Sequence, residues 1–144
     1  MFRKLLHTDI SKSTLIIRLM VGAVFLSEGI QKFLFPAIRG AGRFESIGLP
    51  SPEFLGPFVG TFEILCGALI LIGLFTRYAS IPLIIIMIVA ISTTKLEILA
   101  DKGIWEMMHA GRTDWAMLLG SIFLLIKGGG NWSLDTYLFS SKNN

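Results

Sequence analysis

Four stretches of apolar residues divide this chain, and polar residues, glycine or proline separate each stretch from the next. They cover Leu15–Phe35, Pro57–Phe75, Ile81–Ala100 and Trp115–Ile126. A helix needs about 20 residues, at a rise of about 1.5 Å each, to cross about 30 Å of hydrocarbon. The first three stretches meet this length, whereas the fourth must borrow residues from Met107–Asp114 or lie where the bilayer thins. The pattern predicts an all-α fold, an up-and-down bundle of four transmembrane helices.

Capping and helix-breaking residues set the expected ends of these helices. Pro36 ends the first helix, and a Ser-Pro pair ending at Pro52 starts the second, with Pro57 as the alternative first residue. A Thr-Asp pair ending at Asp114 is expected to cap the fourth helix. Together these signals predict helices over residues 14–35, 52–75, 81–99 and 113–127. The polar segment over residues 101–112 can lie along the membrane surface.

Four crossings place both ends of the chain on one side of the membrane. We expect a short N-terminal segment over residues 1–13, a membrane domain over residues 14–135 and a C-terminal tail over residues 136–144. The side with the termini carries six basic residues: Arg3, Lys4, Lys12, Arg77, Lys127 and Lys142. The other side carries five: Arg39, Arg43, Lys95, Lys102 and Arg112. The positive-inside rule, applied to this small difference, predicts cytoplasmic termini.

Composition agrees with a membrane protein. Charged residues make up 16% of the 144 residues and hydrophobic residues 53%, whereas a soluble domain carries about 25% charged residues. The net charge of +3 comes with no basic run interleaved with aromatic residues, so a nucleic-acid partner is not expected. Membrane lipid is the expected surrounding.

Charged side chains inside the first two stretches narrow the function most. Arg18, Glu28 and Lys32 lie in the first stretch, and Glu63 lies in the second. A charge at the centre of a bilayer costs roughly 2.5–3.5 kcal/mol on insertion scales, so we expect such residues to have partners and a purpose. Arg18 is expected near the terminal side, at the level of Arg77, where its long side chain snorkels to the interface.

Helical spacing brings three of these charges together. Glu28 precedes Lys32 by four residues and can pair with it on the same helix. Glu63, on the antiparallel second helix, is expected at the same depth as Glu28, and Gln31 adds an amide further round the first helix. We therefore expect a buried cluster of two carboxylates and one ammonium, in which one carboxylate holds a proton.

Small residues flank this cluster on both helices and predict a close approach between them. They are Gly22 and Gly29 on the first helix, and Gly60, Cys66 and Gly67 on the second. The cluster then has two interpretations. It can exchange protons with a quinone or a small anion, or it can be a structural ion-pair network that fixes helix register. A structural or interface role is expected for Arg18, Gly22, Gly29, Gly67, Arg77 and Asp135.

Few other residues are candidates for chemistry. His109 can be a proton carrier or a ligand, or an ordinary loop histidine, and Asp135 is expected in a turn or at a cap. Cys66 is the single cysteine, which excludes an internal disulfide and a Cys-x-x-Cys pair, and we expect it to be a packing residue. His7 and His109 share no metal-ligand spacing, so neither a metal site nor a covalent cofactor is expected. The candidate quinone contacts are Glu28, Gln31, Lys32, Glu63 and His109.

Three groups of residues, taken in order, resemble the signatures of the DoxX family. The first is the pattern RLxxGxxFLxxGxxKF over Arg18–Phe33, and the second joins GLPxP at Gly48, GxxExxxG at Gly60 and GLFTR at Gly73. The third is GGGxxSLD over Gly128–Asp135, where Gly129 stands in place of a common proline. The resemblance covers about residues 14–135.

This resemblance implies a small bacterial membrane protein with four helices, located in the plasma membrane. The family takes its name from the membrane subunit of a thiosulfate:quinone oxidoreductase, and some members are linked to oxidative-stress complexes. The characteristic polar positions of the family include Arg18, Lys32, Glu63 and Arg77. The resemblance concerns position and assigns no reaction to the chain itself.

Three functions follow from these observations. The first is the membrane subunit of a redox system, passing electrons to quinone with other membrane or peripheral redox proteins as partners. The second is a non-enzymatic membrane scaffold or assembly factor, in which the charges hold the bundle together. The third is a small transporter, for which four short helices leave a narrow path unless the chain forms a homo-oligomer. Whether the chain is itself an enzyme does not follow from the residues.

Overall fold

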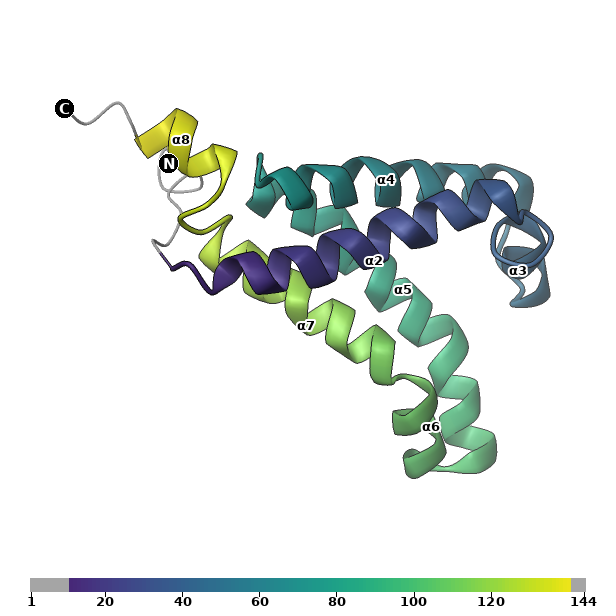
Figure 1. The fold of residues 1–144 in the computed structure, drawn as a ribbon. Coiled ribbons are helices and arrows are strands. Elements are labelled where there is room, and N and C mark those ends of the chain that lie inside the picture. The colour runs from purple at the N-terminus through teal and green to yellow at the C-terminus, as the bar shows by residue number, and fades with distance from the viewer. Residues whose placement is uncertain (1–10, 141–144) are drawn as a thin grey trace.

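A computed structural model describes residues 11–140 of the chain, apart from the side chain of Ser140. The described residues form helices joined by short turns, which confirms the all-α prediction (Figure 1). The helices are α2 (Thr14–Leu34), α3 (Ala41–Ser46), α4 (Pro52–Ile72), α5 (Thr76–Lys102), α6 (Ile104–Ala110), α7 (Arg112–Lys127) and α8 (Leu134–Ser140). The short helix α3 lies within the segment that was expected to be a loop.

The four long helices form two antiparallel pairs. Helix α4 returns alongside α2, and α7 returns alongside α5 (Figure 1). The two pairs meet at the end of the molecule where α2 begins, and they diverge toward α3 and α6 (Figure 1). The up-and-down order that the sequence predicts is therefore present, but the pairs splay apart at one end.

Three of the described helices are long and apolar enough to cross a membrane. They are α2 and α4, with 21 residues each, and α5, with 27 residues. Helix α7 has 16 residues, which span about 24 Å and fall short of about 30 Å of hydrocarbon. The chain interrupts the returning helix at Gly111, so the residues of α6 do not extend α7. The prediction of four spans is thus confirmed for three helices.

The third long helix begins earlier than predicted. Helix α5 starts at Thr76, five residues before the expected start, and Pro82 lies inside it. The reason is a capping group from far along the chain, because the carboxylate of Asp135 accepts hydrogen bonds from the N–H groups of Phe75 and Thr76. The predicted cap of the fourth helix is also displaced, since α7 begins at Arg112.

Glycines allow α2 and α4 to pack closely, as predicted. A Cβ added at Gly22 would lie 3.0 Å from the backbone oxygen of Gly67, and one added at Gly29 would lie 2.7 Å from that of Gly60. These two contacts are seven residues apart on each helix, so they fix both the separation of the helices and their register.

Replacing Gly29 with valine is expected to lower the free energy of unfolding by about 2–3 kcal/mol. The new Cβ would meet the backbone of Gly60 and the backbone nitrogen of Ile64, at 2.8 Å, and neither group can move without moving α4. The measurement is the thermal unfolding midpoint in detergent micelles. Ala23→Val, at an exposed position of the same helix, is the matched control. Equal midpoints for the two variants would contradict this packing.

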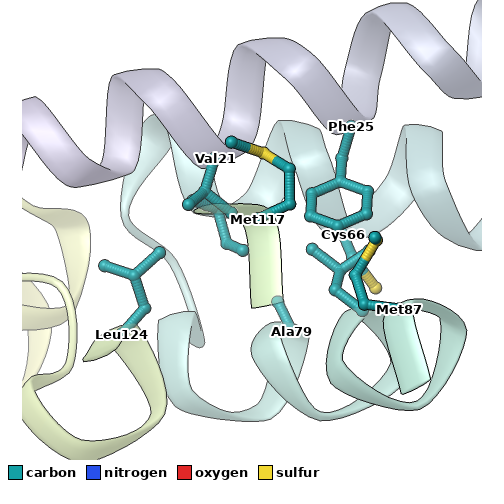
Figure 2. Close-up of a cluster of buried hydrophobic side chains, with 9 residues drawn as sticks. Val21, Phe25, Cys66, Ala79, Met87, Met117 and Leu124 are labelled. Atoms are coloured by element: carbon teal, nitrogen blue, oxygen red, sulfur yellow. The ribbon is translucent and has the colours of Figure 1, made fainter. Parts of the chain in front are cut away.

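The core lies where the two helix pairs meet. Val21 and Phe25 from α2, Cys66 from α4, Met87 from α5 and Met117 from α7 are all buried there and lie together in Figure 2. Cys66 is 4% exposed and packs as part of this cluster, in agreement with its predicted packing role. The core therefore joins all four long helices close to the point from which they diverge.

Candidate functional site

A buried ion pair links α2 to α4. The ammonium of Lys32 lies 2.6 Å from Oε2 of Glu63, and the two side chains are 10% and 5% exposed. Gly60 makes this contact possible, because a Cβ there would lie 3.3 Å from the Cβ of Lys32. The structure thus brings together two of the three charges that the sequence predicts in one cluster.

Glu28 lies beside this pair without joining it. Its side chain is half-buried, and among residues 11–140 no cation lies within 4 Å of its carboxylate. Glu28 lies one helical turn before Lys32 on α2. The expected pair between Glu28 and Lys32 is not formed, because the Lys32 side chain turns toward α4 instead. Two carboxylates consequently share the neighbourhood of one ammonium.

The two remaining candidate quinone contacts lie outside this cluster. The amide of Gln31 donates a hydrogen bond of 3.0 Å to the hydroxyl of Ser27, on the exposed side of α2. His109 is exposed on α6, on the other helix pair and at the diverging end of the molecule (Figure 1). The candidate site in the structure therefore consists of Glu28, Lys32 and Glu63.

Arg18 is not at the surface. Its side chain is 2% exposed, and its guanidinium donates hydrogen bonds to four backbone carbonyl oxygens. Nε donates to Ile70 at 2.9 Å, Nη2 to Leu71 at 2.6 Å, and Nη1 to Gly129 at 3.2 Å and to Trp132. The prediction that Arg18 snorkels to the interface is wrong, because its partners come from the end of α4 and from the loop before α8.

Asp135 makes a second set of hydrogen bonds near Arg18, with the start of α5. Its Oδ1 accepts a hydrogen bond of 2.7 Å from the N–H of Phe75, and its Oδ2 accepts one of 3.0 Å from Thr76. Arg18 thus binds carbonyl groups at the C-terminus of α4, while Asp135 binds N–H groups at the N-terminus of α5. Each charge has the sign that the helix dipole favours there. The predicted cap role of Asp135 is confirmed, on α5 and not on its own helix.

We call the contacts of Arg18 and Asp135 with the turn between α4 and α5 the clasp. Gly73 lies in this turn and contacts Arg18. It has a φ of 72°, and a Cβ there would lie 2.5 Å from the Cβ of Ser133 and 2.7 Å from Cζ of Arg18. Arg77 is half-buried in the first turn of α5, at the same end of the molecule. The structural role expected for Arg18 and Asp135 is therefore that of a clasp over the turn between α4 and α5.

A second ion pair was missed by the sequence analysis. The ammonium of Lys95 on α5 lies 3.0 Å from Oδ2 of Asp114 on α7, and the side chains are 14% and 26% exposed. Both residues had been placed at the membrane surface, as the end of one helix and the cap of the next. The sequence feature that could have predicted this pair is the presence of two opposite charges near the same end of two antiparallel neighbouring helices.

The described residues contain no group of three or more His, Cys, Asp or Glu side chains able to hold a metal ion. The groups that the site offers are a hydrogen-bond donor, Lys32, and two carboxylates that can hold or release protons, Glu28 and Glu63. These groups lie within α2 and α4, two of the helices long and apolar enough to cross a membrane.

Comparisons with known proteins confirm the family that the resemblance indicated, although the family model does not reach the third signature over Gly128–Asp135. The DoxX family model matches residues 13–96. "Uncharacterized membrane protein Rv3486" of Mycobacterium tuberculosis is 52% identical over 141 residues, which cover 94% of this chain and 86% of that protein. "Putative oxidoreductase CatD" of Bacillus subtilis is 33% identical over 132 residues, which cover 91% of this chain and 90% of that protein. No solved structure matches the chain significantly.

Proposed function

The chain belongs to the DoxX family, and from this premise we propose that it is the membrane subunit of a redox system and binds a quinone beside Lys32 and Glu63. The observation that carries the proposal is the buried Lys32–Glu63 pair with Glu28 beside it. Ionisable groups within a membrane span are by default candidates for a functional site.

Other contacts already hold α2 against α4, and this supports a functional role for the pair. The glycine contacts fix the separation of the two helices, and Arg18 binds the carbonyl groups of Ile70 and Leu71 on α4. A buried ion pair adds little net stability, because the desolvation of both charges offsets their attraction. The pair is therefore better explained by a ligand that uses its hydrogen-bonding groups.

The three residues fit the oxygen atoms of a quinone. The Lys32 ammonium can donate a hydrogen bond to one quinone oxygen, and Glu28 and Glu63 can pass protons to the ring oxygens. Reduction to the quinol takes up two electrons and two protons, and each C=O group becomes C–OH. In this proposal the electrons come from a partner redox protein or from a reduced sulfur compound such as thiosulfate. The protons come from water by way of Glu28 and Glu63.

The relative CatD carries the word oxidoreductase in its name, which supports a redox role over the other functions considered. The proposed setting is the bacterial plasma membrane, with both termini in the cytoplasm and the 16-residue helix α7 as a short fourth crossing. The proposed partners are membrane or peripheral redox proteins. They would supply the electrons.

The proposal is tested by binding of a short-chain quinone analogue to the purified full chain in lipid nanodiscs. Calorimetric titration is expected to show saturable binding to the wild type and at least about tenfold weaker binding to Glu63→Gln, since a hydrogen bond to a charged group contributes about 1.5–3 kcal/mol. Glu97→Gln, at an exposed position on α5, is the matched control. Wild type without saturable binding, or a Glu63→Gln affinity equal to that of the wild type, would contradict the proposal.

A scaffold role is the second candidate, and the observation that favours it is the position of the pair between two helices. In that case Lys32 and Glu63 would stabilise the bundle and bind no ligand. The quinone-binding role and the scaffold role predict different unfolding midpoints for the double variant Lys32→Met/Glu63→Gln.

A further inference from the structure

A short loop and helix α8 lie at the end of the molecule where α2 begins (Figure 1). The N–H of Asn131 donates a hydrogen bond of 3.2 Å to the carbonyl oxygen of Ser11, just before α2. The N–H of Asp135 donates one of 2.8 Å to the carbonyl oxygen of Gly73, in the turn after α4. Helix α8 is therefore held beside the start of α2 and the end of α4.

The lengths of α2 and α4 set the depth of this end in the membrane. Each helix has 21 residues and spans about 32 Å, which matches a hydrocarbon thickness of about 30 Å. We therefore expect the start of α2 at Thr14 and the end of α4 at Ile72 to lie where the hydrocarbon meets the headgroups. Because α8 is bonded to residues next to both of these ends, it is expected in the interfacial layer as well.

One side of α8 faces the protein, and the other side is apolar and exposed. Asp135, on the protein side, is 5% exposed. The exposed fractions of Leu134, Tyr137 and Leu138 are 40%, 75% and 47%. These three residues are three and four positions apart, so they form one stripe along the helix. Apolar surface is unfavourable in water and tyrosine is favoured at membrane interfaces, so we expect the stripe to lie against lipid.

An open groove of about 490 Å³ lies between α8 and the end of α4. Its volume is within the range of small-ligand sites, which is about 300–1,000 Å³. Asn131 and Thr136 add polar groups to walls that are otherwise apolar or aromatic and that include Ile72, Trp132, Leu134 and Tyr137. No acidic side chain is among the described residues that line it. A groove of this composition at the interface fits the part of a lipid where the acyl chains meet the headgroup.

A positive charge lies at the rim of this groove. The ammonium of Lys12 lies 5.9 Å from the centroid of the Trp132 ring, in a cation–π contact. Both side chains are exposed, and among residues 11–140 no carboxylate lies within 4 Å of this ammonium. The contact thus places a cation beside a wall of the groove, at the expected level of the lipid headgroups.

We propose that this groove binds one anionic phospholipid, with the headgroup toward Lys12 and an acyl chain along Ile72 and the stripe of α8. The cation at the rim favours an anionic lipid over one without net charge, because basic residues near a membrane surface attract anionic headgroups. The apolar walls favour a lipid over a free anion. This inference does not depend on the proposed quinone site.

The test is native mass spectrometry of the purified full chain in detergent micelles, titrated in turn with phosphatidylglycerol, phosphatidylcholine and inorganic phosphate. The wild type is expected to bind one phosphatidylglycerol about fivefold more tightly than phosphatidylcholine, since one lysine at the surface changes the affinity for anionic lipid by about this factor. Inorganic phosphate is expected to bind far more weakly than either lipid, because it has no apolar part to fill the groove.

Two variants with matched controls assign the binding to the groove. Lys12→Gln should weaken phosphatidylglycerol binding about fivefold and remove the preference over phosphatidylcholine. Trp132→Ala should weaken the binding of both lipids by at least about fivefold, because it removes an apolar wall. Lys102→Gln and Trp105→Ala, exposed at the opposite end of the molecule, are the controls and should bind like the wild type (Figure 1).

The outcomes decide between a lipid and other occupants of this surface. A preference for phosphatidylglycerol that Lys12→Gln removes and both controls keep supports the proposal. Equal affinity of the wild type for the two lipids, or wild-type affinity in Lys12→Gln or in Trp132→Ala, overturns it. Inorganic phosphate bound as tightly as phosphatidylglycerol would show a site for a free anion and overturn it. A mass of two chains that Trp132→Ala reduces to one would show that a second copy covers the groove, which also overturns it.

Discussion

Arg18→Met is expected to lower the free energy of unfolding by on the order of 4 kcal/mol, about 1 kcal/mol for each hydrogen bond lost. The variant removes four hydrogen bonds and leaves the carbonyl oxygens of Ile70, Leu71, Gly129 and Trp132 without their donor. These carbonyls belong to two segments, the end of α4 and the loop before α8, and the guanidinium joins both of them to α2. Loss of the guanidinium should therefore destabilise the end of the molecule where α2 begins.

The measurement is the thermal unfolding midpoint in detergent micelles, where a change of this size corresponds to a fall of roughly 10 °C. Arg43→Met, exposed on α3, is the control and should change the free energy by less than about 0.5 kcal/mol. Arg18→Lys should fall between the two, because an ammonium lacks the planar fork of donors. An Arg18→Met midpoint equal to that of the Arg43→Met control would contradict the clasp.

Lys32→Met is expected to lower the free energy of unfolding by about 3–5 kcal/mol. The substitution leaves Glu63, which is 4% exposed, as a buried carboxylate with its cation removed and with Glu28 still nearby. Adding Glu63→Gln removes the uncompensated charge. The double variant Lys32→Met/Glu63→Gln should therefore return to within about 1 kcal/mol of the wild type.

The unfolding midpoints of the single and double variants test this directly. Recovery in the double variant means that the pair is not required for the fold, because glycine packing and Arg18 hold α2 on α4 without it. A double variant as unstable as Lys32→Met would instead show that the pair itself stabilises the bundle, and this result favours the scaffold role.

The sequence predicted the contact between α2 and α4 because the signals for it are local. Gly22, Gly29, Gly60 and Gly67 recur every seven residues on two apolar helices, and the structure places them in contact. The depth of Glu63 followed from the antiparallel return of α4. These inferences needed only helix geometry and the direction of the chain.

The clasp could not be predicted in the same way. The partners of Arg18 are backbone carbonyls 52, 53, 111 and 114 positions away in the chain, and residue types do not mark such atoms. The start of α5 was misplaced for the same reason, because its cap, Asp135, comes from 59 and 60 positions away. Long-range contacts of a charged side chain with backbone groups depend on how the helices are assembled.

The second ion pair was missed because its residues were read as helix ends. Lys95 lies well inside α5, which continues to Lys102, and Asp114 lies in the first turn of α7.

The most direct test of the central claim is the affinity of the double variant Lys32→Met/Glu63→Gln for the short-chain quinone analogue, measured on protein whose unfolding midpoint matches the wild type. The account predicts a folded protein that binds the analogue at least about tenfold more weakly than the wild type does, because a hydrogen bond to a charged group contributes about 1.5–3 kcal/mol. A folded double variant that binds the analogue as tightly as the wild type would contradict it.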